Sequence, residues 1–371
     1  MNQEYSYKNK EFWNRQFIDY CPPARKELRE QPVPQTQKEH VRRLGDSDFD
    51  IEAFINSKMG EAVADLQAGY PSTGSDVNPA ADLYWKERGY DREYHPEDRR
   101  EHSWVSLVPS DLEEGEKLPE VVLIHGGQAN GLASDMEASG YVHEVIKRDR
   151  AVFVLPANTE TDNTIYAMDR ADPILPIDKT RVYIIGFSGG GAWARYTALT
   201  HPERFAAYAP NGSNLMSWPA LADDAMLAKV REIGLPVCIY AGLREFLRIF
   251  PLNQNGVKFT GILGKDEQPG TPEEKYMLFR RCLYASGCSD ISPEECMKAA
   301  EDPDPARQMC GAPGGDAKMI RLLDTDHAVI DYTRENGTPG MRIICVDNMP
   351  HVVSPSAAGL VWEFLRQFKR Y

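Results

Sequence analysis

The sequence has 371 residues, of which 42% are hydrophobic and 26% are charged, and its formal net charge is −14. This length and composition are typical of a globular protein with a sizeable core, built as one large domain or two smaller ones. The acidic charge argues against nucleic acid or an anionic membrane as the main partner, because both bind basic surfaces. No stretch approaches the roughly 18 apolar residues of a membrane span.

The N-terminal sequence MNQEYSYKNKEFW is polar and has no apolar segment of the kind found in secretory signal peptides. We therefore expect a cytoplasmic protein, with a mature secreted form as the alternative. Seven cysteines cannot all pair within one chain, and no paired zinc motif is present among Cys282, Cys288, Cys296 and Cys310. No metal or other cofactor is predicted, and disulfide bonds are expected only if the protein is exported.

Residues 1–97 differ in composition from the rest of the chain. They are rich in charged residues, proline and aromatic side chains, and we expect a mainly helical, partly irregular N-terminal extension without strands. Apolar residues at helical spacing predict helices over residues 9–20 and 48–66. We interpret the apolar faces of these helices as packing surfaces rather than as a ligand site.

Residues 98–371 predict an α/β domain with a mostly parallel, twisted sheet and helices on both faces, because short apolar runs alternate with helical segments. In chain order, strands are expected at residues 102–109, 121–124, 151–155, 182–185, 205–209, 236–241 and 341–346. Helices are expected at residues 140–148, 192–199 and 357–368. The interval at about residues 250–335 is rich in Gly, Pro and Cys, and we expect it to form a lid-like insertion.

Residues 186–190 have the pattern G-x-S-x-G and stand between an expected strand and an expected helix. A serine at such a sharp turn has a strained backbone, and the residues two before and two after it must lack bulk. Gly186 and Gly190 meet that requirement. The motif in this context predicts that Ser188 is a catalytic nucleophile at the carboxyl edge of the sheet, beside a helix N-terminus that favours negative charge. The alternative is a surface serine in a glycine-rich turn.

A serine nucleophile needs a general base, and after a strand–turn–helix of this type the chain order is Ser, then Asp or Glu, then His. Beyond His201, which we interpret as structural, the candidates are His327 and His351. His351 follows the expected strand 341–346, and a doubly wound sheet places its site at the carboxyl ends of its strands. We therefore favour His351 as the base and keep His327 as the alternative.

The base in turn needs a carboxylate that holds its ring in the correct tautomer. Glu245 lies just past the expected strand 236–241, the penultimate strand, and is the first choice for this role. A surface ion pair with Arg244 or Arg248 is the alternative interpretation of Glu245. Other candidates for the acid are Asp324, Asp326 and Asp347.

An oxyanion hole needs two backbone N–H groups aimed at one point. Gly189 supplies the first, because it follows the nucleophile. The second is expected from Gly127 or Gln128 in the sequence LIHGGQANG, where glycines let the backbone approach a substrate closely. Side chains near strand ends are candidates for the substrate pocket, although each is equally compatible with the core: Leu215, Trp218 and Phe246.

Several segments together resemble the α/β-hydrolase esterases related to polyhydroxybutyrate depolymerases and to feruloyl and acetylxylan esterases. They include VVLIHGGQANG, RVYIIGFSGGGAWA, FAAYAPNGS, PVCIYAGLRE and IICVDNMPHVV. The resemblance covers roughly residues 100–371, in the family's order. It implies an α/β-hydrolase fold with Ser188 as nucleophile, His351 as base and Gly189 as oxyanion donor. The acid of those esterases is usually an aspartate in a stretch like G-T-A-D, where this sequence has Glu245.

These residues predict a serine hydrolase that cleaves a carboxylic ester through an acyl-enzyme intermediate. The expected substrate is a small or aromatic acyl ester or a short hydroxyalkanoate ester. A peptidase or thioesterase with the same triad, or a non-catalytic hydrolase-like binding protein, is the alternative. The expected partner is therefore a small-molecule ester, with no nucleic acid and no membrane span, and a homo-oligomer is left open.

Overall fold

The computed structural model describes residues 35–127, 131–213, 221, 223–247, 249–255 and 271–370. The helix predicted over residues 9–20 lies outside the described residues, as do Gln128, Leu215 and Trp218. Among the helices that are described, none is both long and apolar enough to cross a bilayer.

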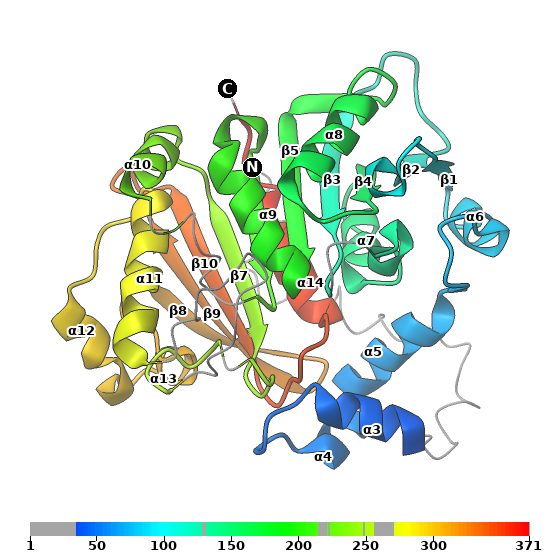
Figure 1. Cartoon of the computed structure of the whole chain (residues 1–371). Coiled ribbons are helices and arrows are strands. Elements are labelled where there is room, and N and C mark those ends of the chain that lie inside the picture. The colour runs from blue at the N-terminus through cyan, green and yellow to red at the C-terminus, as the bar shows by residue number, and fades with distance from the viewer. Residues whose placement is uncertain are drawn as a thin grey trace.

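The centre of the fold is a ten-stranded sheet with the order β1-β2-β4-β3-β5-β6-β7-β10-β9-β8 (Figure 1). Its six middle strands, from β4 to β10 in that order, are parallel. On the flanks, β2 is antiparallel to β1 and β4, and β9 is antiparallel to β10 and β8. The strands are β1 (Tyr90–His95), β2 (Trp104–Pro109), β3 (Leu118–Ile124), β4 (Val152–Pro156), β5 (Ile177–Phe187), β6 (Ala207–Asn211), β7 (Val237–Gly242), β8 (Asp316–Leu322), β9 (Thr325–Thr333) and β10 (Pro339–Val346).

Helices cover both faces of this sheet. The helices are α3 (Gln35–Arg43), α4 (Ile51–Ile55), α5 (Lys58–Gly69), α6 (Pro79–Lys86), α7 (Gly140–Ile146), α8 (Thr161–Ala171), α9 (Gly189–Thr200), α10 (Asp224–Ile233), α11 (Pro272–Ala285), α12 (Pro293–Met297), α13 (Pro305–Cys310) and α14 (Pro355–Leu365). Helices α8, α9, α10, α11 and α13 contribute to the core on one face. Helices α5, α6, α7 and α14 contribute to the core on the other.

The alternation of side chains along β3 explains why there are two cores. Val122 and Ile124 pack into the core of α8 and α9, whereas Val121 and Leu123 pack into the core of α7 and α14. Successive side chains of a strand point to opposite faces, so a strand covered on both sides must be apolar throughout. This is why short continuous apolar runs located the strands correctly. All seven predicted strands and all three predicted helices of residues 98–371 are present, with ends shifted by a few residues.

The helix predicted over residues 48–66 is divided in two. Helix α4 ends at Ile55 and α5 begins at Lys58. Between them Ser57 has an extended backbone, and its side chain accepts a hydrogen bond from the Gly60 N–H. This N-cap satisfies a donor that the helix itself cannot pair, so it starts a new helix inside a continuous apolar pattern.

Tyr90–His95 forms β1, although no strand is expected before residue 98. The side chains of Tyr90 and Arg92 are buried and alternate with exposed ones. That alternation is typical of a strand with one covered face, but a charged residue at an inward position conceals it. The sheet therefore begins inside the segment that the composition assigns to the N-terminal extension.

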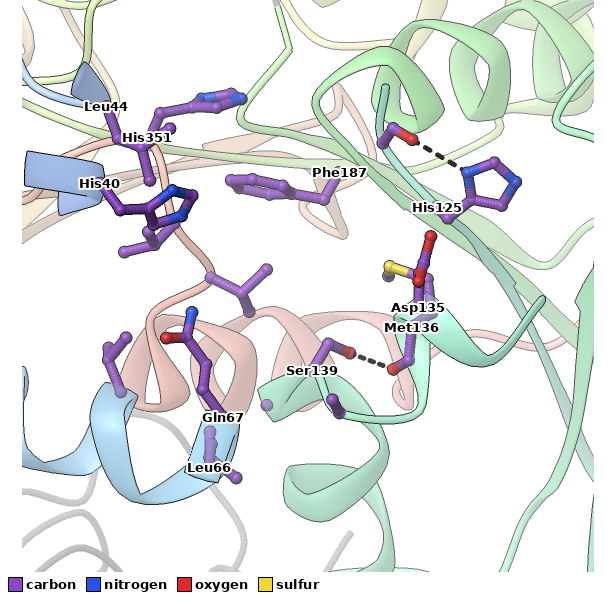
Figure 2. Close-up of a pocket in the computed structure, with 16 residues that line it drawn as sticks. His40, Leu44, Leu66, Gln67, His125, Asp135, Met136, Ser139, Phe187 and His351 are labelled. Carbon is purple, nitrogen blue, oxygen red and sulfur yellow. Dashed lines mark hydrogen bonds between the residues drawn. The ribbon is translucent and has the colours of Figure 1, made fainter. Parts of the chain in front are cut away.

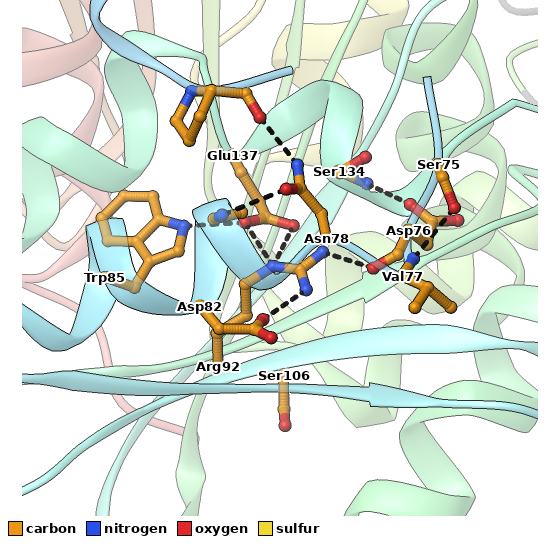
Figure 3. Close-up of polar contacts among 12 residues, drawn as sticks. Ser75, Asp76, Val77, Asn78, Asp82, Trp85, Arg92, Ser106, Ser134 and Glu137 are labelled. Carbon is orange, nitrogen blue, oxygen red and sulfur yellow. Dashed lines mark hydrogen bonds and ion pairs between the residues drawn. The ribbon is translucent and has the colours of Figure 1, made fainter. Parts of the chain in front are cut away.

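A buried polar network compensates the charge of Arg92 (Figure 3). The Arg92 Nε donates to both carboxylate oxygens of Glu137, at 2.8 and 3.0 Å, and its Nη2 donates to the Asp76 carbonyl at 2.9 Å. The Tyr70 hydroxyl and the Trp85 indole N–H also donate to Glu137, at 2.8 and 2.7 Å. Burying a charge is tolerated when it is paired and hydrogen-bonded. The network thereby joins residues 70–92 to the segment just before α7.

Much of the interval at about residues 250–335, expected as a lid, belongs to the sheet and the core instead. Strand β9 pairs with β10, and β8 pairs with β9, while residues 256–270 lie outside the described residues. Leu323 and Asp324 both have positive φ and form the two-residue turn between β8 and β9. Two-residue hairpin turns of type I′ require this conformation at both positions and usually contain asparagine or glycine. Leu323 and Asp324 are neither, so the sequence carries no turn signal at this hairpin.

The described cysteines are core residues. All six are buried free thiols: Cys238, Cys282, Cys288, Cys296, Cys310 and Cys345. Burial raises the pKa of Cys288 and of Cys296 to about 11. Because the thiolate is the reactive form, these two thiols stay protonated and unreactive at neutral pH.

Glu120 is a buried acid in the middle of β3. Its side chain is fully buried, and neither carboxylate oxygen has a hydrogen-bond partner among the residues that the structure describes. Burial raises the pKa of Glu120 to about 8, and the nearby Asp172 adds to the rise. The carboxyl group is therefore protonated in the folded protein at neutral pH, whereas it would be ionised in the unfolded chain.

This difference predicts that Glu120 lowers the free energy of unfolding as the pH rises. The pKa of Glu120 is higher in the folded protein than in the unfolded chain. The free energy of unfolding therefore falls between about pH 4.5 and about pH 8, by roughly 5 kcal/mol in total. Glu120→Gln, which carries no charge, should lose less stability between about pH 5 and about pH 8.5 than the parent does in chemical unfolding. Glu114→Gln, at an exposed turn position before β3, should keep the parental pH dependence. Equal slopes for the parent and Glu120→Gln would contradict the prediction.

Candidate active site

Ser188 occupies a sharp turn between the end of β5 and the start of α9. Its φ is 57° and its ψ is −125°, a conformation that side-chain-bearing residues rarely adopt. A Cβ atom at Gly186 would lie 2.1 Å from the Gly190 carbonyl oxygen, and one at Gly190 would lie 2.2 Å from the His125 carbonyl oxygen. Both contacts are far shorter than van der Waals distances. Only glycine fits at these two positions, so the motif is a steric requirement of the turn.

Three predicted side chains come together at this turn. The Ser188 Oγ lies 2.8 Å from His351 Nε2. On the other side of the ring, His351 Nδ1 makes a short hydrogen bond with Glu245 Oε2. Ser188 follows β5, Glu245 follows β7 and His351 follows β10. Because these strands are parallel, their carboxyl ends meet at one edge of the sheet, which brings residues distant in sequence into contact.

Glu245 and His351 are both buried, with 1% and 8% of their surface exposed. Burial raises the pKa of the Glu245 carboxyl, and the hydrogen bond with His351 opposes that rise. The rings of Phe187 and Phe246 lie 4.8 and 5.0 Å from the imidazole ring of His351. A hydrogen bond is electrostatically stronger in such a water-poor environment than in water. The pair is therefore arranged to hold the imidazole ring in one orientation.

The alternative bases and acids have other partners. His327 is fully buried, with Nε2 2.7 Å from the Ser356 hydroxyl, and burial lowers its pKa to about 4. Asp324 forms an ion pair with Lys58, and Asp326 forms one with Arg321. Asp347 accepts a hydrogen bond from the backbone of the next residue, Asn348. The structure thus brings Glu245 and His351, and none of the alternatives, into the hydrogen-bonded chain with Ser188.

The HGG loop after β3 lies directly against Ser188. A Cβ atom at Gly126 would be 3.0 Å from the Ser188 Cβ, and Gly127 has a φ of +80° that favours glycine. His125 supports the loop from behind, since its ring nitrogens lie 2.9 Å from the Gly126 carbonyl oxygen and 3.2 Å from that of Ala157. Gly189 is buried as the first residue of α9. The backbone of the predicted oxyanion segment is therefore adjacent to Ser188.

A pocket of about 310 Å³ opens beside the imidazole ring (Figure 2). Phe187, His351 and Gly126 line it. The N-terminal region also lines it, with His40 of α3, Leu44 just after α3, and three residues of α5: Val63, Leu66 and Gln67. Phe246 contacts His351 but is not among the lining residues, and it is 39% exposed.

This N-terminal wall is the part of the site that sequence reasoning missed. Val63 and Leu66 belong to the apolar stripe of the predicted helix 48–66, which was interpreted as a packing surface. A helix stripe that packs on a core and one that lines a pocket have the same 3.6-residue period. The sequence therefore contains no signal that separates the two roles.

No protein-family model matches this sequence, and no curated protein is similar to it. Solved structures with partial similarity include the S-formylglutathione hydrolase from Staphylococcus aureus, with 16% identity and a TM-score of 0.33 over 42% of this chain and 78% of that one. A ferulic acid esterase has 14% identity and a TM-score of 0.34 over 41% and 78% of the two chains. The acylaminoacyl peptidase of Pyrococcus horikoshii has 14% identity and a TM-score of 0.29 over 43% and 33%.

The fold of this chain is the α/β-hydrolase fold, as its own architecture shows. A mostly parallel sheet with an antiparallel second strand carries helices on both faces. A strained serine stands at a strand-to-helix turn above the carboxyl edge of that sheet, which is the arrangement of an α/β-hydrolase nucleophile elbow. The predicted fold class is therefore confirmed.

The contact between Glu245 and His351 predicts a specific mutational effect. Glu245→Gln keeps the size of the side chain but removes the charge that stabilises a protonated imidazole ring, and its amide favours the wrong tautomer. We expect kcat for any ester that the protein hydrolyses to fall by at least about a thousandfold. Asp326→Asn and Asp347→Asn should change kcat by less than about threefold, because neither contacts His351. A variant of Asp326 or Asp347 that lost as much activity as Glu245→Gln would contradict the assignment of the acid.

Proposed function

We propose that this protein is a serine hydrolase that cleaves carboxylic esters through an acyl-enzyme intermediate. The observation that carries the proposal is the hydrogen-bonded chain Ser188–His351–Glu245 at a strained turn. A serine hydroxyl is a weak nucleophile until an adjacent base accepts its proton. The 2.8 Å contact between Ser188 Oγ and His351 Nε2 is within the range required for that transfer.

In the proposed reaction His351 takes the proton of Ser188 as the hydroxyl attacks the ester carbonyl carbon. The Glu245 carboxylate stabilises the imidazolium ring that results. Backbone N–H groups of Gly189 and of Gly127 or Gln128 bind the oxygen on which negative charge develops. His351 then donates its proton to the leaving alcohol, and a water molecule releases the acid in a second round of the same steps.

The pocket supports a compact, largely apolar group on one side of the scissile bond. At about 310 Å³ it lies near the lower end of the usual range for small-molecule pockets. Apolar side chains that contribute to its wall include Leu66, Met136 and Val352. Short hydroxyalkanoate and aromatic acyl esters, the substrates that the sequence resemblance implies, combine these properties and are the first esters to test.

Covalent labelling tests the proposed nucleophile directly. A fluorophosphonate reacts with an activated serine, so intact mass spectrometry should show one adduct on the parent protein and none on Ser188→Ala. The substitution removes only the hydroxyl oxygen, and a circular dichroism spectrum equal to the parent's would establish that the fold is kept. A folded parent protein without an adduct would contradict the proposal and favour a non-catalytic binding protein. An adduct on both proteins would place the reactive group elsewhere.

A matched substrate panel distinguishes an ester hydrolase from a thioesterase and from a peptidase. The same acyl group is offered as an alkyl ester, as a thioester and as a peptide amide, and kcat/KM is measured for each with the parent and with Ser188→Ala. The proposal expects the ester to be the best of the three. A higher kcat/KM for the thioester or the amide would keep the serine mechanism and replace the substrate class.

Pocket size predicts a change in acyl-chain preference for Leu66→Ala. Removing the Leu66 side chain from the wall enlarges the pocket, so kcat/KM should shift toward esters that are longer by two or three carbons, by about tenfold relative to the parent. Leu83→Ala is a suitable control, because Leu83 is exposed on α6 and does not line the pocket. An unchanged chain-length profile for Leu66→Ala would show that substrates do not use this pocket.

A further inference from the structure

The backbone of residues 44–46 joins two loops of the candidate site. The acid loop follows β7 and carries Glu245, and the histidine loop follows β10 and carries His351. The Leu44 carbonyl oxygen accepts a hydrogen bond from the His351 N–H at 2.9 Å, and it accepts a second from the Phe246 N–H at 3.4 Å. Phe246 is the residue after Glu245. A single carbonyl group from the N-terminal region thus connects the backbone of both loops.

One further hydrogen bond strengthens this connection. The Asp46 N–H donates to the Arg244 carbonyl at 2.7 Å. Together with the bond between the Phe246 N–H and the Leu44 carbonyl, it forms an antiparallel bridge in which Gly45 faces Glu245. The residues on both sides of Glu245 are therefore hydrogen-bonded to the short segment that precedes α4. Backbone hydrogen bonds of this kind restrain position, because each bond has a narrow range of favourable length and angle.

Asn348 fixes the same segment from the histidine loop. Its Oδ1 accepts a hydrogen bond from the Asp50 N–H at 2.9 Å, and its Nδ2 donates to the Asp50 carbonyl at 2.8 Å. Asn348 has a φ of 41°, in the left-handed region that asparagine and glycine tolerate best. It stands three residues before His351, in the loop that follows β10.

We propose that residues 44–50, which we name the N-terminal strap, position the general base and its carboxylate partner, and that Asn348 is the residue that locks the strap in place. The inference rests on the proposed function, because it assigns a role within that active site. The strap is fastened to the histidine loop at His351 and Asn348, and to the acid loop at Arg244, Glu245 and Phe246.

The physical reason is that both catalytic partners of Ser188 are on loops. Strand ends fix the start of each loop, but a shift of about 1 Å in a catalytic group can reduce the rate by about a hundredfold. The Arg244 N–H donates directly to the Met349 carbonyl at 3.1 Å, and the strap adds a second connection between the two loops, which restrains the geometry of the contact between Glu245 and His351. It also continues from α3, so Leu44 lines the pocket with its side chain while its carbonyl holds the base.

Asn348→Gly tests this role without disturbing the backbone. Glycine accepts the left-handed conformation, so the change removes only the two hydrogen bonds with Asp50. We expect kcat for the best ester and the rate constant of fluorophosphonate labelling to fall together by about tenfold, with KM changed by less than about twofold. Asn348→Asp keeps an acceptor for the Asp50 N–H but sets a carboxylate oxygen against the Asp50 carbonyl, so both quantities should fall at least as far as in Asn348→Gly.

Asn336→Gly is the matched control. Asn336 lies beyond the opposite end of β10 and closes its own turn, with Oδ1 accepting from the Thr338 N–H at 3.0 Å and from the Thr338 hydroxyl at 2.7 Å. The same substitution there removes the same number of hydrogen bonds far from Ser188. Its thermal midpoint should fall by an amount comparable to that of Asn348→Gly, while its kcat and labelling rate stay at the parental value.

The outcomes separate this inference from the proposed function. A parent protein that is not labelled at Ser188 overturns the proposed function and the strap with it. A parent that is labelled, together with an Asn348→Gly variant that is folded and reacts at the parental rate, overturns the strap alone. An equal loss of kcat in Asn348→Gly and Asn336→Gly would mean that loop stability in general, and not positioning, is responsible. If Asn348→Gly does not fold, Asn348→Asp is compared with the parent by the same measurements.

Discussion

The close approach of three backbone segments at Ser188 is the constraint on which the site depends. The end of β5, the first turn of α9 and the end of β3 meet without room for a side chain at Gly186 or Gly190. This packing holds Ser188 in a strained conformation that no local interaction would favour, so the surrounding sheet must impose it. With the serine fixed in this way, the carboxyl ends of β7 and β10 place a carboxylate and an imidazole ring beside it.

Three buried glutamates show how differently the fold treats the same side chain. Glu137 accepts hydrogen bonds from a guanidinium, a phenol and an indole group, and it joins the N-terminal region to the sheet domain. Glu245 has one strong partner, His351, and its second oxygen has none among the described residues. Glu120 has no hydrogen-bond partner among those residues, and its pKa rises to about 8. The carboxylate with a single partner is the one that contacts His351 in the candidate site, and perturbed carboxylates concentrate at functional sites.

The N-terminal region is structurally inseparable from the candidate site. Helices α3, α4 and α5 gather at one end of the molecule (Figure 1), where residues of α3 and α5, together with Leu44, line the pocket. The Asp76 carboxylate accepts hydrogen bonds from the backbone of Ala133 and Ser134. These two residues directly precede residues 135–140, most of which also line the pocket. The N-terminal region therefore lines the pocket itself and also holds a second segment that lines it. A substitution in residues 35–92 can therefore change the shape of the pocket without touching Ser188 or His351.

The sequence by itself determined the α/β architecture and the residues of the hydrogen-bonded chain. Apolar runs marked the buried strands because both sheet faces are covered, and G-x-S-x-G marked the turn because only glycine fits there. Chain order left two histidines and several carboxylates as candidates, and position after a strand favoured His351 and Glu245. The structure joins these two residues to Ser188. Only the tertiary structure decided the rest. Arg92 concealed β1, and a turn without glycine or asparagine concealed the hairpin of β8 and β9. The apolar stripe of α5 that lines the pocket could not be distinguished from a packing surface. The strand, the hairpin and the pocket wall all depend on contacts between segments that are distant in sequence, and a local sequence pattern does not predict such contacts.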